Sequence, residues 1–269
     1  MTNPIKKNII IFGESGCGKS SIVNMIAGRE AAEVSNSAIG CTFKHERHEF
    51  SIMDIPFSIY DTAGLNEGEQ GRVPHWQAVH QLYTLIRTLD GVSLLIYCMR
   101  GRIKENARAN WILFSEVLCA KKVPIIAVET GLEHEEDLEG RHILLRNWLK
   151  GYGIFPGGIA CVVSVRGKKS DHEDRYNWSQ HQLRHLIMCS CRRVPWVTDD
   201  WVGHIYKTTY TTKLCLFSDV KVEYVREAGN VVDDFIVQTG MKKEESEKLK
   251  STLLDAERKF IRKRKYLLL

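Results

Sequence analysis

The sequence predicts an α/β protein in which a mostly parallel sheet of six strands is covered on both sides by helices, in three layers. Two observations support this prediction. Short apolar runs alternate with longer stretches of helical spacing up to about residue 190, which is the pattern of strands joined by crossover helices. A glycine-rich loop, Gly13–Ser20, also stands directly between the first apolar run and the first helical stretch.

Six strands and five helices are expected before residue 190. The strands are 8–12, 44–52, 56–61, 92–98, 123–128 and 158–163, and the helices are 19–28, 76–89, 105–121, 138–152 and 177–189. Only a few residues separate the second and third strands, which predicts an antiparallel hairpin, whereas the other connections are long enough for crossovers. We therefore expect a domain over residues 1–195 and a C-terminal extension over 196–269, with a basic helix over 244–265.

Composition and charge limit the functions open to this chain. Its 269 residues are 43% apolar and 26% charged, which excludes disorder throughout. The longest apolar run is far shorter than the roughly 20 residues of a membrane-spanning helix, and residues 1–7 lack a signal-peptide core. A cytoplasmic protein is expected, with its eight cysteines as reduced thiols. Residues 241–269 hold ten Lys and Arg against five Asp and Glu, an excess equal to the net charge of +5, so attraction to polyanions is expected in the tail.

The glycine-rich loop matches the pattern G-x-x-x-x-G-K-[ST] at every fixed position. Its residues are Gly13, Glu14, Ser15, Gly16, Cys17, Gly18, Lys19 and Ser20. Glycines allow several backbone N–H groups to turn inward around an oxyanion. Lys19 is expected to meet the β- and γ-phosphates and Ser20 to ligate Mg²⁺, while the helix that begins around Ser21 adds partial positive charge. The alternative is a glycine-rich turn with an incidental lysine. Cys17 is either a small residue at a variable position or a redox-sensitive thiol.

A second motif, D-x-x-G, follows the third strand at Asp61–Gly64. With it the chain resembles the translation-factor-related (TRAFAC) class of P-loop GTPases, also called G domains. This resemblance implies a P-loop NTPase fold with GTP or GDP and Mg²⁺ as ligands. It also implies that Asp61 holds a water of the Mg²⁺ shell and that the Gly64 amide contacts the γ-phosphate. Residues 21–28 and 39–42 are similar to the branch of septins, immunity-associated GTPases and chloroplast-import receptors, and the chain as a whole looks most like G-domain proteins of fungi.

The same resemblance implies a role for Thr42, as the switch threonine that completes Mg²⁺ coordination in the triphosphate state. An ordinary threonine at the edge of a strand is the alternative.

The base-recognition motif departs from the family pattern. Where related proteins carry N-K-x-D or T-K-x-D, this chain has Thr130-Gly131-Leu132-Glu133. Glu133 keeps the acceptors that pair with the guanine N1 and N2 donors, on a longer stem, while Gly131 removes the lysine that normally covers the base. Ser164 stands where a third motif would support the base. Glu133 also begins an acidic run, so a solvated loop is the alternative.

Hydrolysis is expected to be slow. The resemblance places Lys19, Thr42 and Gly64 at the reacting phosphate, but Leu65 replaces the glutamine that orients water in Ras-like proteins, and a leucine cannot bind water. Candidate arginine donors that could stabilise the reacting phosphate are Arg29, Arg47 and Arg72, and each also fits an ordinary surface arginine.

These patterns predict a Mg²⁺-dependent GTPase that acts as a switch or as a dimerising GTPase. The partners expected are guanine nucleotide, a second G domain, and an anionic membrane surface bound through the basic tail. The alternative for the tail is docking of its apolar residues on the G domain or on a second subunit. No nucleic acid is expected, because no aromatic platform accompanies the basic run. Two alternatives stay open, a nucleotide-binding interaction module with negligible turnover and an ATP-using P-loop ATPase.

Overall fold

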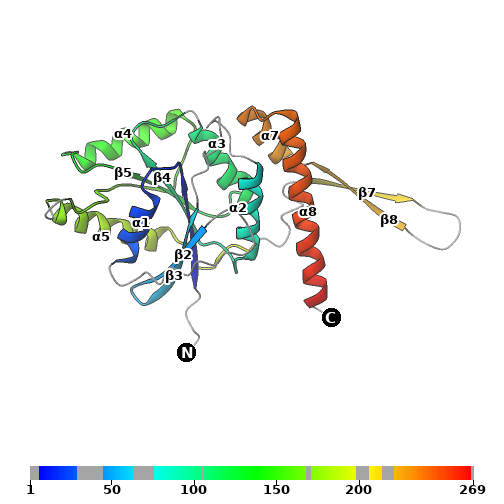
Figure 1. Cartoon of the computed structure of the whole chain (residues 1–269), viewed down its shortest axis with the longest axis horizontal. Helices are drawn as coiled ribbons and strands as arrows, with labels where there is room; N and C mark the ends of the chain where they lie inside the picture. The colour runs from blue at the N-terminus through cyan, green and yellow to red at the C-terminus, as the bar shows by residue number, and fades with distance from the viewer. Residues whose placement is uncertain are drawn as a thin grey trace.

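The computed structural model describes residues 6–28, 45–62, 76–104, 106–167, 171–197, 206–213, 221–228 and 230–267 (Figure 1). Its strands are β1 (Lys7–Gly13), β2 (His45–Ile52), β3 (Ile55–Thr62), β4 (Leu94–Arg100), β5 (Ile125–Thr130), β6 (Gly158–Cys161), β7 (Tyr206–Lys213) and β8 (Lys221–Ala228). Its helices are α1 (Lys19–Ala27), α2 (Trp76–Thr88), α3 (Ala107–Ile112), η1 (Leu113–Leu118), α4 (Leu138–Gly151), α5 (Glu173–Ser190), α7 (Asn230–Thr239) and α8 (Lys243–Leu267).

The central sheet has six strands in the order β2-β3-β1-β4-β5-β6. Only the β2–β3 pair is antiparallel, and the remaining neighbours in the sheet run parallel. The predicted fold class and the predicted hairpin are therefore confirmed. Because β1, β3, β4 and β5 are parallel, their carboxyl ends meet at one edge of the sheet, where the loop after β1 and the segment after β4 line a crevice.

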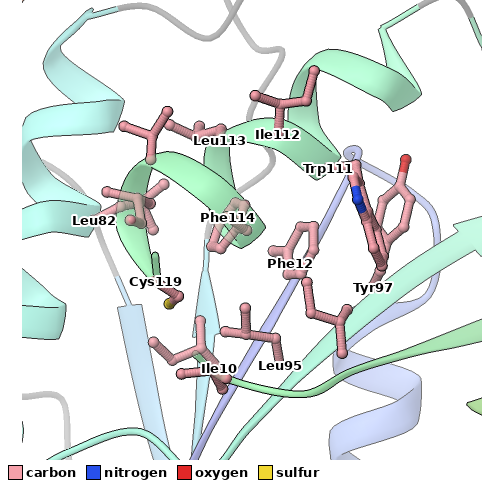
Figure 2. Close-up of a cluster of buried hydrophobic side chains, with 14 of the residues drawn as sticks. Ile10, Phe12, Leu82, Leu95, Tyr97, Trp111, Ile112, Leu113, Phe114 and Cys119 are labelled. Carbon is pink, nitrogen blue, oxygen red and sulfur yellow. The ribbon is translucent and has the colours of Figure 1, made fainter. Parts of the chain in front are cut away.

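Side chains of β1 alternate between two apolar layers, as the twofold period of a strand requires. Ile9 and Ile11 face the layer under α1 and α5, while Ile10 and Phe12 face the layer under α2, α3, η1 and α4. In the second layer, Phe12 stacks on Phe114 with ring centroids 3.8 Å apart (Figure 2). The sheet is thus enclosed between two layers of helices, which fixes the crevice at its edge.

The helix expected over residues 105–121 has two parts of different helical type. α3 continues without a break into η1, a π-helical segment. Ala120 and Lys121, just beyond it, have φ of +53° and +56°. A π-helical turn shifts the register of the side chains that follow it. Leu113, Phe114 and Leu118 of η1 are all fully buried in the apolar layer.

The C-terminal part of the chain packs on the second layer. Strands β7 and β8 form an antiparallel hairpin that extends away from the sheet (Figure 1), and neither this hairpin nor α7 was expected from the sequence. α8 packs against α2, and α7 packs against α3 and η1. Phe235, Leu249 and Leu253 are fully buried there. A division of the chain at residue 195 stays a prediction. None of the described helices is both long and apolar enough to cross a bilayer.

Candidate functional site

The glycine-rich loop lies at the carboxyl edge of the sheet, between β1 and α1. Gly18 has a φ of +90°, and a Cβ added there would lie 2.8 Å from Thr130 Oγ1. A residue with a side chain would be strained in this conformation and would collide with β5. The loop therefore turns tightly onto α1, whose first-turn N–H groups have no partner within the helix and can face an anion.

Lys19 lies across this loop. Its side chain is nearly buried, and Nζ donates hydrogen bonds to the backbone oxygens of Glu14 at 2.9 Å and Gly13 at 3.3 Å. The carboxylate of Glu14 forms an ion pair with Lys104, from the segment that follows β4. The loop thus holds an ammonium group at its centre, and the one acidic side chain in it is neutralised.

Ser20 and Asp61 form the part of the site suited to a metal ion. Ser20 Oγ donates a hydrogen bond to Asp61 Oδ2 at 2.8 Å, whereas Asp61 Oδ1 is buried and has no hydrogen-bond partner among the residues that the structure describes. Burial raises the pKa of Asp61, partly offset by the Ser20 hydrogen bond and the charge of Lys19. A hydroxyl and an unsatisfied carboxylate oxygen form a donor set that Mg²⁺ prefers. The residues present therefore fit the expected ion.

Thr130 connects β5 to the glycine-rich loop. Its Oγ1 donates a hydrogen bond to the backbone oxygen of Cys17 at 2.7 Å. The Cys98 thiol donates to the same oxygen at 3.1 Å. A hydrogen bond with Cys98 lowers the pKa of the Cys17 thiol, and Lys19 adds to this effect against the opposing effect of burial. Two strands far from the loop in the sequence, β4 and β5, thus hold it at one backbone oxygen.

The segment after β5, residues 131–135, is held from two sides, and we call it the base loop. Ser164 Oγ donates to Glu133 Oε1 at 3.4 Å, so these two predicted base-binding residues lie together. From α5, Arg175 donates through Nη1 to the Glu133 backbone oxygen at 2.7 Å and through Nη2 to that of Leu132 at 3.3 Å. Arg175 also donates to the backbone oxygen of Glu135. These contacts hold the backbone of the base loop and the Glu133 carboxylate in position.

Several predicted residues lie outside the described part of the chain. They are Thr42 and Gly64, with Leu65, Arg29 and Arg72. Arg47 is described, and its guanidinium is paired with Glu49 on the same strand, β2. The structure therefore brings together the loop, Lys19, Ser20, Asp61, Thr130, Glu133 and Ser164, and leaves the two switch residues as predictions.

Three basic residues at the site were not predicted from the sequence. Lys104 pairs with the glycine-rich loop, Arg175 holds the base loop, and Arg100 lies against Gly131. The position of Arg100 at the end of an apolar strand was a usable signal, because β4 is parallel to β1 and ends at the same edge. Nothing in the sequence around Arg175 indicates which loop it contacts.

The family comparison agrees with this geometry. Residues 8–129 match the family model of the 50S ribosome-binding GTPases. The chain is 30% identical over 126 residues to the tRNA modification GTPase MnmE of Legionella pneumophila (strain Paris), over 47% of this chain and 27% of that protein. It is 28% identical over 137 residues to MnmE of Actinobacillus pleuropneumoniae serotype 5b (strain L20), over 49% and 28%. The chain thus spans little more than a quarter of the length of these relatives.

Solved structures with a related arrangement include translation elongation factor SelB of Methanococcus maripaludis in complex with the GTP analogue GppNHp. That match has a TM-score of 0.43 and 13% identity, over 71% of this chain and 34% of SelB. The G domain of the T. maritima FeoB iron transporter matches with a TM-score of 0.40 and 19% identity, over 66% of this chain and all of that domain.

Proposed function

We propose that this chain, which contains a P-loop GTPase G domain with GTP or GDP and Mg²⁺ as its ligands, is a nucleotide-controlled switch that hydrolyses GTP slowly. The observation that carries the proposal is the pairing of Ser20 with Asp61 beside Lys19. In that arrangement a buried carboxylate oxygen, next to the glycine-rich loop, has no partner in the part of the chain that the structure describes. The septin-like branch to which the motifs point remains part of the proposal.

Each residue of the site has a separate task in binding. The glycine-rich loop presents its amides to the phosphates, and the Lys19 ammonium exchanges its two backbone acceptors for phosphate oxygens. Glu133 accepts hydrogen bonds from the guanine ring, and a donor left unpaired there costs about 1 to 3 kcal/mol. Mg²⁺, when bound, neutralises phosphate charge. Ser20 and Asp61 would hold it, with Thr42 as the third residue.

Slow hydrolysis follows from the residue next to the D-x-x-G motif. Leu65 cannot orient a water molecule, so the chain has to rely on the loop and on Lys19 until another group completes the site. A missing arginine finger alone costs about 10³ to 10⁵ in rate. We propose that a second G domain supplies the missing group. Under this proposal the rate per molecule rises as the protein is concentrated.

Leu65 also favours a second function, a nucleotide-binding interaction module with negligible turnover. Single-turnover assays over a range of protein concentrations separate the two. A rate that increases with concentration supports the dimerising GTPase. A rate that stays near zero at every concentration supports the interaction module.

Competition between GTP and ATP tests the proposed ligand directly. We expect GTP to displace a fluorescent guanine nucleotide at far lower concentration than ATP does, because adenine lacks the adjacent N1–H and N2–H donors that the Glu133 carboxylate would accept together. Lys19→Ala is expected to abolish triphosphate binding and to leave the fold intact. Lys150→Ala, which removes an exposed lysine from α4, is the matched control and should bind as the unmodified chain does. Equal displacement by ATP would support the ATPase alternative, and unchanged affinity in Lys19→Ala would remove the phosphate-loop assignment.

The tail carries the remaining part of the proposal, contact with an anionic membrane surface. Residues 241–269 hold an excess of five basic residues, and each basic side chain near such a surface contributes about 1 kcal/mol. Flotation with anionic and neutral vesicles, with and without these residues, tests it. Equal flotation of the full and the shortened chain would remove it.

A further inference from the structure

The base loop lacks a side chain that related G domains use. The resemblance described above places a lysine at position 131, where it covers the base, and this chain has Gly131. A glycine there leaves one face of the purine uncovered. The structure shows what lies in the space that this side chain would have occupied.

That space is filled by Arg100. A Cβ built on Gly131 would lie 2.5 Å from Arg100 Nε, 3.0 Å from its Cγ and 3.1 Å from its Cδ. Gly131 also has a φ of +79°, which disfavours any residue with a side chain. The two positions are therefore linked, because Arg100 can lie where it does only while residue 131 is a glycine.

The fold holds Arg100 between the two halves of the nucleotide crevice. It is the last residue of β4 and stands directly opposite Thr130 in the register with β5. A cavity of about 150 Å³ is lined by Arg100 together with Gly16 and Cys17 of the glycine-rich loop. The side chain is exposed, and its guanidinium has no hydrogen bond or ion pair to any residue that the structure describes. It is available to a ligand.

We propose that Arg100 stacks its guanidinium on the purine ring of the bound nucleotide and so replaces the covering lysine that the base motif lacks. The proposal rests on the guanine-nucleotide site proposed above. A guanidinium is planar and weakly hydrated, and it stacks on aromatic rings better than an ammonium does. Stacking reads the face of the base, so it adds affinity without distinguishing the groups on the purine edge. Edge recognition stays with Glu133.

The test is calorimetric titration of the full chain with GDP and with inosine diphosphate, which lacks the 2-amino group. Arg100→Met is expected to lower the affinity of the chain for both nucleotides by the same factor, about tenfold. Arg100→Lys keeps the charge without the plane and should recover only part of this loss. The matched control is Arg102→Met, which removes the same charge from another exposed residue of the same cavity and should bind within about twofold of the unmodified chain.

Three results would overturn the proposal. They are GDP affinity in Arg100→Met equal to that of the unmodified chain, an equal loss in Arg102→Met, and a loss for GDP that inosine diphosphate does not share. The second would mean that only positive charge matters, and the third that the base loop has been distorted. Thermal unfolding of Arg100→Met should match the unmodified chain, since the side chain is exposed. Failure of the unmodified chain itself to bind GDP would instead remove the proposed function.

Discussion

At the scale of single residues, the most informative atom in the site is Asp61 Oδ1. It is buried and has no partner within the described ranges of the chain, while Oδ2 of the same carboxylate accepts a hydrogen bond from Ser20. A native structure seldom leaves a buried carboxylate oxygen without a partner, because the unmet desolvation is costly. We therefore expect a ligand that arrives with the nucleotide to contact this oxygen.

This explanation predicts the behaviour of Asp61→Asn. We expect Mg²⁺ to raise the GTP affinity of the unmodified chain. In the variant this increase in affinity should be about 10- to 100-fold smaller, which is the usual effect of losing a residue that orients a metal's ligands. Titrations with Mg²⁺ and with EDTA measure it. Asp54→Asn, at an exposed turn between β2 and β3, removes the same charge and should keep the full increase. A full increase in Asp61→Asn would exclude this residue from the metal site.

At the scale of elements, α5 positions the base loop through one side chain. Arg175 donates to three groups of that loop, the backbone oxygens of Leu132, Glu133 and Glu135. Hydrogen bonds from a charged donor are stronger than those between neutral groups, so several of them to one loop hold its backbone in place. α5 thereby holds the base loop in place, and under the proposed function it takes part in guanine recognition through that loop.

Arg175→Met is therefore expected to reduce the preference for GTP over ATP about tenfold, by freeing the Glu133 carboxylate to move. The same helix supplies the control, because Arg184 also donates to backbone oxygens, those of Ile26 and Ser51, away from the base loop. Arg184→Met should lose stability but keep the preference. Should both variants discriminate equally well, Arg175 would be a structural residue only.

A buried ion pair joins β5 to α4 just before the base loop. Arg141 binds the Glu129 carboxylate through Nε at 2.9 Å and through Nη2, and Glu129 is fully buried. Removing one partner leaves an uncompensated buried charge, so Arg141→Met is expected to lower the free energy of unfolding by about 3 to 5 kcal/mol. Urea unfolding measures the loss. Adding Glu129→Gln to this variant should restore part of the stability, and a double variant no more stable than the single one would contradict the reasoning.

The elements of the sheet were predictable, and the reason is local. Apolar runs such as 8–12 and 123–128 and the phosphate-loop pattern are continuous in the sequence, and each carries its own signal. The contacts of Arg100 and Arg175 are not local. They depend on which strand ends and helices the fold brings to one edge, and no spacing in the sequence records that. The π-helical turn within 105–121 was not predicted either, and its contact with α7 is likewise one that no local pattern records.

At the scale of the whole molecule, the C-terminal helices and the sheet share one apolar layer. Leu249 and Leu253 of α8 are fully buried in the cluster that also contains Leu82 and Ile86 of α2. α2 begins at Trp76, shortly after residues 64–72, the segment that the D-x-x-G motif predicts to be a switch. Because α8 packs against α2, a change in that segment could reach α8 through α2. We also expect the C-terminal helices and the sheet to unfold together.

Leu253→Ala tests this cooperation. Truncating a fully buried leucine lowers the free energy of unfolding by about 2 to 5 kcal/mol. We therefore expect a single urea transition at a lower midpoint, and the fluorescence of the chain and the release of bound GDP should both follow it. Val237→Ala truncates an apolar side chain of α7 that is 78% exposed and should shift the midpoint little. Suppose instead that GDP release kept its original midpoint while fluorescence showed an earlier step. The extension would then unfold alone, as the boundary at residue 195 predicts, and α8 would have no part in holding the nucleotide domain together.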